Sequence, residues 1–144
     1  MHFLIVHGHM DCDVDAAELV CNSLRQRNIE ASVITDEEFI RSYRSNGYFI
    51  ISIGGPKVNR ITRRVQEIYQ RALDVSQYDI CWAYGSKGTG VKSNAYHLNS
   101  PCIAIFGPQQ NDTLHSIESF IYDGLLDRII EEPKSWQGKL VESR

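Results

Sequence analysis

Short apolar runs alternate along the chain with longer segments in which apolar residues recur every three or four positions. The short runs predict strands, bounded by Gly, Pro, Asp or Asn, near residues 3–6, 31–34, 48–53, 80–83 and 102–106. The longer segments predict helices after Asn111 and over residues 14–27, 36–44 and 57–73. This alternation is typical of βαβ units. We therefore expect one α/β domain over residues 1–130, a Rossmann-like or flavodoxin-like three-layer sandwich with a mainly parallel five-stranded sheet, followed by a polar carboxyl-terminal extension over residues 131–144.

The size and charge of the chain narrow its class. Its 144 residues are 42% hydrophobic, which suits one globular domain whose core needs no disulfide or structural metal. With 15 basic and 18 acidic residues the net charge is −3, so no basic field favours nucleic acid or an anionic membrane. No apolar stretch reaches the length of a membrane span, and the four cysteines show no CxxC spacing. We expect a soluble cytoplasmic protein with reduced thiols.

Loops that follow predicted strands carry residues suited to ligand binding, because ligands of parallel α/β sheets bind beyond the carboxyl ends of the strands. The loop after residues 48–53 opens a helix, so its glycines and the helix dipole favour an anion such as phosphate. The candidate ligand-binding residues there are Gly54, Gly55, Pro56 and Asn59. The alternative is a tight strand-to-helix turn in which Asn59 or Thr62 only satisfies backbone groups.

The glycine-rich segment after the fourth predicted strand is a second candidate. It offers permissive backbone, one cation and two hydroxyl groups, which together can close over a phosphate or a ribose, in Ser86, Lys87, Gly88 and Thr89. The alternative is a surface loop whose glycines serve turns.

The loop after the first predicted strand supports two opposite interpretations. His7, His9, Asp11 and Asp13 alternate, so an extended backbone would direct them to one side, where the set His9, Asp11 and Asp13 could bind a metal. Alternatively, Asp11, Asp13 and Asp15 cap the following helix, whose amino end favours negative charge. No distant group of His or Cys completes a known ligand spacing, so we expect no bound metal.

The start of the chain resembles a known family. Phe3-Leu4-Ile5-Val6-His7-Gly8-His9 is similar to the opening of bacterial TIR-like nucleotide-binding domains, in which an apolar strand ends in VHGH before a helix. Glu38, in a short predicted helix, then has a position similar to that of the glutamate with which such domains cleave nicotinamide from NAD. This resemblance covers the first third of the chain and implies a nucleotide ligand. Glu38 also has capping-box spacing with Thr35, which gives it a structural alternative.

Two shorter motifs resemble other families. Asp11-Cys12-Asp13-Val14-Asp15-Ala16 resembles the first aspartate motif of DHH-type phosphoesterases, which bind manganese and hydrolyse phosphodiesters. Ile53-Gly54-Gly55-Pro56-Lys57-Val58-Asn59 with Thr62, together with Gly107 and Asp112-Thr113, is similar to modules of archaeal surface-layer proteins, which are structural.

We therefore expect a small cytoplasmic domain that binds a nucleotide-type ligand, NAD or another nucleotide. As an enzyme it would hydrolyse a glycosidic or phosphoester bond, with Glu38 stabilising an oxocarbenium-like state and His9 as the second catalytic residue. His7 and Gly8 complete the ligand-binding set. The alternatives are a noncatalytic module that assembles into homo-oligomers and a metal-dependent phosphoesterase.

Overall fold

A computed structural model describes residues 2–10, 13–42, 48–69, 80–84, 101–106 and 113–131 of the chain. Several candidate site residues lie outside these ranges, namely Asp11, Ser86, Lys87, Gly88 and Thr89. All but the first residue of the expected polar extension also lies outside them.

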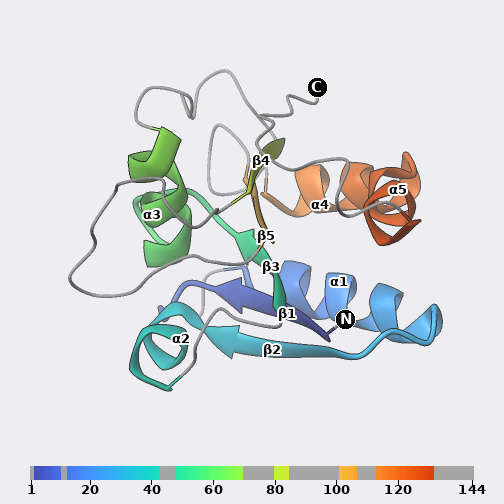
Figure 1. The fold of residues 1–144 in the computed structure, drawn as a ribbon, viewed down its shortest axis with the longest axis horizontal. Coiled ribbons are helices and arrows are strands. Elements are labelled where there is room, and N and C mark those ends of the chain that lie inside the picture. The colour runs from blue at the N-terminus through green and yellow to red at the C-terminus, as the bar shows by residue number, and fades with distance from the viewer. Residues whose placement is uncertain are drawn as a thin grey trace.

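The sheet has the strand order β2-β1-β3-β5-β4 (Figure 1). Its strands are β1 (His2–His7), β2 (Ala31–Thr35), β3 (Tyr48–Ile53), β4 (Ile80–Tyr84) and β5 (Pro101–Ile105). The strands β2, β1, β3 and β5 run parallel, with Ile5 aligned with Val33 on one side and Ile51 on the other. At the far edge β4 pairs antiparallel with β5. The expected α/β chain with a parallel sheet is confirmed.

Helices cover both faces of the sheet (Figure 1). They are α1 (Val14–Gln26), α2 (Asp36–Ser42), α3 (Arg60–Tyr69), α4 (Thr113–Tyr122) and α5 (Leu125–Glu131). Phe3 and Ile5 pack in a core with α1, α4 and α5, while Leu4 and Val6 pack in a second core with α2 and α3. Successive strand residues point to opposite faces, so a strand covered on both sides must be apolar throughout. This burial explains the continuous apolar runs.

Two helices differ from the expected pattern. The third helix was predicted from residue 57, but α3 begins at Arg60, because residues 56–58 form a turn in which Val58 and Asn59 donate backbone N–H groups to the Gly55 carbonyl. The expected helix after Asn111 is two helices, since Gly124 adopts a φ of +88° that ends α4 before α5 begins. Within the described ranges, no helix combines the length and apolar character needed to cross a membrane.

Candidate functional site

The candidate site lies at the carboxyl ends of β1 and β3, which are neighbours in the sheet (Figure 1). From β1 the chain passes to α1 on one face, and from β3 it passes to α3 on the other face. Adjacent strands whose connections diverge in this way form a topological switch point, where open α/β sheets bind ligands. The loops beginning at His7 and at Gly54 were both predicted from the sequence. They meet at the same edge of the sheet, the carboxyl ends of β1 and β3, which we call the rim.

The buried side chain of Asn59 holds the elements of this rim together through hydrogen bonds. Its side chain is fully buried, and Nδ2 donates to the carbonyl oxygens of Val6 at 3.0 Å and Ile53 at 2.8 Å. Its Oδ1 accepts the backbone N–H groups of Ile61 and Thr62 in the first turn of α3. The amide of Asn59 thus joins two strand ends to one helix start. The backbone-satisfying alternative from the sequence describes these contacts.

Asp36 directly follows β2 and is the most connected carboxylate of the rim. It is 0% exposed, and it accepts the backbone N–H of Glu37 at 2.8 Å and that of Arg60 at 2.9 Å. It also accepts a hydrogen bond from Nδ1 of His9 at 3.1 Å. Sequence analysis missed Asp36, although a carboxylate that follows a buried strand and opens a helix was a usable signal. It occupies the amino end of α3, where the sequence suggested an external anion.

His9 is oriented by that carboxylate. Because an ionised carboxylate can only accept, Nδ1 of His9 is the donor in this hydrogen bond. The side chain of His9 is 30% exposed, and Nε2 lies 3.9 Å from Oε1 of Glu37. A buried carboxylate that holds one ring nitrogen of a partly exposed histidine is the orienting half of a general acid–base pair.

His7 and Gly8 are tied to each other. The ring of His7 is nearly buried, and its Nδ1 donates to the Gly8 carbonyl at 2.9 Å. That bond fixes the ring beside the start of α1 and close enough to Asp13 to interact with its charge. Both residues shape the rim by supporting its backbone.

Asp13 precedes α1 but does not cap it with its side chain. Its backbone is left-handed, with a φ of 65°, and its side chain makes no capping hydrogen bond, so the expected capping role of this residue is wrong. Oδ2 is buried without a hydrogen-bond partner among the described residues, and it lies 2.6 Å from the position that a Cβ would take on Gly54. Burial raises the pKa of Asp13, while the charge of His7 lowers it. A partly buried carboxylate, with one oxygen fully enclosed, therefore stands at the switch point.

In the turn that follows β3, Gly54 and Pro56 are packed against other residues, whereas Gly55 has free space beside it. Gly54 has a φ of +105° and no room for a side chain beside Asp13, and its N–H donates to Ile105. Pro56 is buried, with its carbonyl accepting from Nε of Arg63. Gly55, in contrast, faces open space. Among the described residues, no acceptor contacts the backbone N–H of Gly55, which makes it a candidate donor to a ligand.

Glu38 lies in the first turn of α2, and its backbone N–H donates to Oγ1 of Thr35 at 3.1 Å. This bond is the Thr35 half of the predicted capping box. No described contact joins the Glu38 carboxylate to His9, whose nearest acidic neighbours are Asp36 and Glu37.

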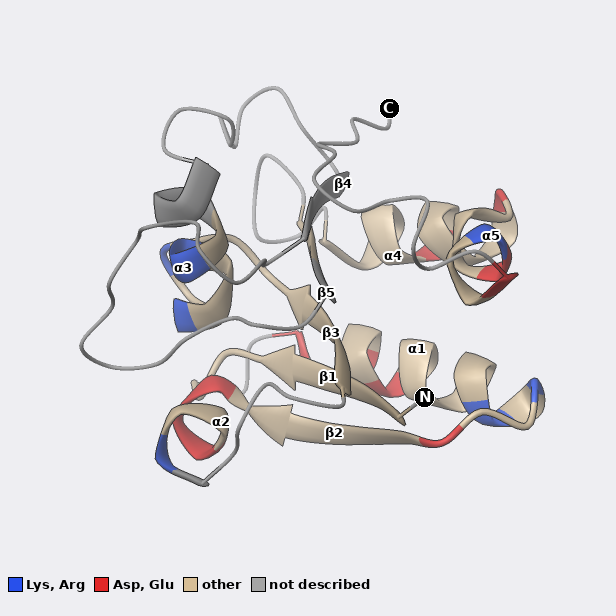
Figure 2. Ribbon diagram, in the orientation of Figure 1, with Lys and Arg blue, Asp and Glu red and all other residues tan. Residues whose placement is uncertain are grey.

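Charges of opposite sign flank the rim. The first turn of α2 is acidic, whereas the exposed residues at the start of α3, Arg60 and Arg63, are basic (Figure 2). Across the described ranges, no three His, Cys, Asp or Glu side chains are close enough to hold a metal ion. The polarity of the rim suits a ligand that has both an anionic part and hydrogen-bond donors.

Comparison with known proteins assigns no family to this fold and site. None of the protein-family models scanned matches the chain, and a search of curated proteins returns no significant match.

Proposed function

We propose that the chain is a Rossmann-like, flavodoxin-like cytoplasmic domain that binds a nucleotide-type ligand between the ends of β1 and β3 and hydrolyses its glycosidic or phosphoester bond. The observation that carries this proposal is His9, held at Nδ1 by the fully buried Asp36 while its ring remains 30% exposed. A buried carboxylate that fixes the orientation of a histidine ring is the arrangement by which catalytic triads hold their base.

The proposed chemistry follows from the fixed position of Asp36. Backbone N–H groups from α2 and α3 hold its carboxylate from two directions, so it cannot turn away from His9. Nε2 of His9 takes a proton from water as the water oxygen bonds to the anomeric carbon or the phosphorus. The leaving group departs with the bonding electron pair. An alkoxide or phosphate leaving group receives the proton from the imidazolium, whereas nicotinamide leaves as a neutral molecule and the imidazolium returns its proton to solvent. Glu38 has the role implied by the TIR-like resemblance, stabilising positive charge on the sugar.

The proposed ligand has its phosphate on the α3 side of the rim. Gly55 offers a backbone N–H beside open space, and Lys57 is exposed next to it. The carboxylate of Asp13 lies against Gly54 and repels phosphate, so the phosphate is restricted to the open side of Gly55. The sugar then lies toward His9 and the acidic turn of α2.

A ligand panel followed by a matched pair of variants tests the proposal. NAD, ATP, cyclic nucleotides and Mn²⁺ are screened by thermal shift, where a ligand at a hundred times its Kd stabilises by about 2.7 kcal/mol. Release of nicotinamide or phosphate is then measured chromatographically. His9→Gln should lower turnover by about 10²-fold and leave binding nearly unchanged.

His2→Gln is the matched control for His9→Gln. The side chain of His2 is 31% exposed and also contacts a carboxylate, that of Glu30 at 3.4 Å, but it lies at the opposite end of β1. Its substitution should leave turnover unchanged. Equal turnover in the two variants would remove His9 from the mechanism, and equal turnover in wild type and Glu38→Gln would remove Glu38. No response to any member of the panel contradicts the proposal and favours the noncatalytic assembly module.

A further inference from the structure

The outer edge of β2 ends the sheet, because no described strand pairs with it. The hydrogen bond from Phe3 N–H to the Glu30 carbonyl sets which β2 groups face β1. With Phe3 aligned with Ala31, the backbone groups of Ala31 and Val33 point away from the sheet. Nη2 of Arg25 already donates to the Ala31 carbonyl at 3.0 Å. The N–H and C=O of Val33 are therefore the exposed pairing groups at the centre of this edge.

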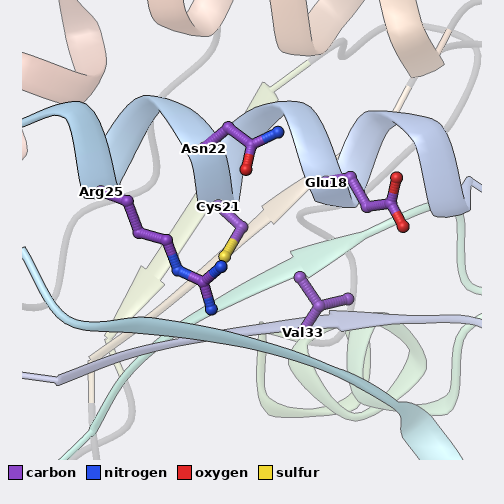
Figure 3. Close-up of a pocket in the computed structure, with 5 residues that line it drawn as sticks. All are labelled: Glu18, Cys21, Asn22, Arg25 and Val33. Atoms are coloured by element: carbon purple, nitrogen blue, oxygen red, sulfur yellow. The ribbon is translucent and has the colours of Figure 1, made fainter.

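A hollow of about 380 Å³ adjoins this edge on the α1 side. Figure 3 shows the side chains that line it, with Glu18 and Arg25 at its two ends and Val33 on the strand between them. Glu18 and Arg25 are two helical turns apart, about 10 Å along the helix axis, with Cys21 and Asn22 midway. The edge thus presents an acid, a neutral centre and a base in line.

We propose that the outer edge of β2 and the hollow beside it bind a second copy of this chain. A two-fold axis that passes beside Val33 pairs β2 antiparallel with β2 of the second copy, and the two Val33 residues exchange both backbone hydrogen bonds. The same axis reverses α1, so Glu18 of each copy faces Arg25 of the other. The Val33 side chains of the two copies then lie side by side at the axis, and the two hollows become continuous.

The spacing of the elements fits this arrangement. Helix α1 packs on both β1 and β2, and adjacent strands lie about 4.8 Å apart. Continuing the sheet across the axis therefore places the two α1 helices on one face and about 10 Å apart, which is the distance at which helices pack. Charged side chains of the length of Glu18 and Arg25 can meet across that distance.

The hollow fits a second copy better than a thiol-directed ligand. Cys21 is buried, and its Sγ donates to the Ala31 carbonyl. Burial raises the pKa of this thiol, so the thiolate is not the form presented. Glu18 and Arg25, in contrast, carry opposite charges at the two ends of the hollow, and a partner with the reversed pattern satisfies both. A second copy related by a two-fold axis has that pattern.

The test is a charge exchange read by sedimentation equilibrium of the full chain over a range of concentrations. Wild type should form dimers. Glu18→Arg and Arg25→Glu should each weaken dimerisation by about 10- to 30-fold, because two attractive contacts per dimer become repulsive. An equimolar mixture of the two variants should recover the wild-type affinity, since each chain then supplies the charges that the other needs.

Glu118→Arg on the exposed side of α4 is the matched control, because it changes the net charge equally and should leave the dimer intact. Arg25→Glu also loses the bond to the Ala31 carbonyl, so its folding is checked by circular dichroism. Glu18 makes no hydrogen bond within the described ranges, and Glu18→Arg therefore tests the contact even if Arg25→Glu unfolds. A wild type that stays monomeric, or a dimer insensitive to Glu18→Arg, overturns the proposal.

Discussion

Replacing Asn59 with alanine should destabilise the fold by about 3 kcal/mol. The substitution removes the acceptor for the first turn of α3, a capping loss of about 1 kcal/mol. It also removes the side-chain donor from the carbonyls of Val6 and Ile53 at a fully buried position, at about 1 kcal/mol for each. With a urea m-value of about 1.5 kcal/mol/M, the unfolding midpoint should fall by about 2 M.

Asn59→Asp separates the two parts of this loss. Aspartate caps a helix as well as asparagine does, so a residue that only capped α3 would tolerate the change. In this structure Nδ2 lies between two carbonyl oxygens, and a carboxylate there provides no donor and repels both. Asn59→Asp should therefore destabilise by at least about 2 kcal/mol. Thr35→Ala, which removes a single capping contact of α2, gives the scale of about 1 kcal/mol.

Urea unfolding monitored by circular dichroism measures all three variants. An unfolding midpoint for Asn59→Asp equal to that of wild type would refute the interpretation that Nδ2 of Asn59 holds the ends of β1 and β3 together. A loss of ligand response with unchanged stability would instead return Asn59 to the ligand-binding set.

Two further predictions concern carboxylates whose pKa the fold changes. Asp13→Asn should stabilise the protein at neutral pH, because burial raises the pKa of Asp13 and asparagine tolerates its φ of 65°. Because the pKa of Asp13 is raised in the folded state, protonation of Asp13 stabilises the wild-type fold fully below the ordinary value of 3.8. This stabilisation is lost as pH rises through the folded-state pKa. Unfolding measured over a range of pH should therefore show that the stability gained by Asp13→Asn shrinks in acid. Asp127→Ala should cost under about 1 kcal/mol, because the Asp127–Arg27 pair at 2.6 Å is partly exposed. The hydrogen bond from Arg27 lowers the pKa of Asp127, so the pair stabilises above 3.8 and its contribution disappears as pH falls through the lowered pKa; equal effects at both ends of the titration would contradict this.

The layout of the sheet could be predicted from the sequence because burial leaves a local signature. Residues 48–53 were predicted as a strand from an apolar run, and β3 occupies the same residues, since a strand covered on both faces must be apolar at every position. The start of α3 at Arg60 could not be placed in this way. It depends on Asn59, whose side chain reaches the ends of two strands. The contact with Val6 joins residues that are distant in the sequence, so the pattern of the neighbouring residues does not indicate it.

The rim was predicted in location but not in its connections. The turn at residues 54–59 was expected to offer free backbone N–H groups to an anion. In the structure the carboxylate of Asp36 already accepts the backbone N–H of Arg60 at the start of α3. Asp13 was expected to cap α1 because it is one of several aspartates at the start of that helix, yet its side chain lies against Gly54. Both outcomes depend on residues distant in sequence. The Thr35 cap, which spans a single helical turn, was visible in the sequence and is present.

The proposed site and the proposed dimer surface share β2, but neither depends on the other. Asp36 follows the last residue of β2, and its carboxylate is held by backbone N–H groups of α2 and α3 within one copy. Pairing across the outer edge of β2 adds no residue to the rim, so His9 is complete in the monomer. Glu18→Arg should consequently weaken association without changing turnover, whereas His9→Gln should lower turnover without changing association. A variant that lost both properties together would show that β2 transmits strain between its edge and its carboxyl end.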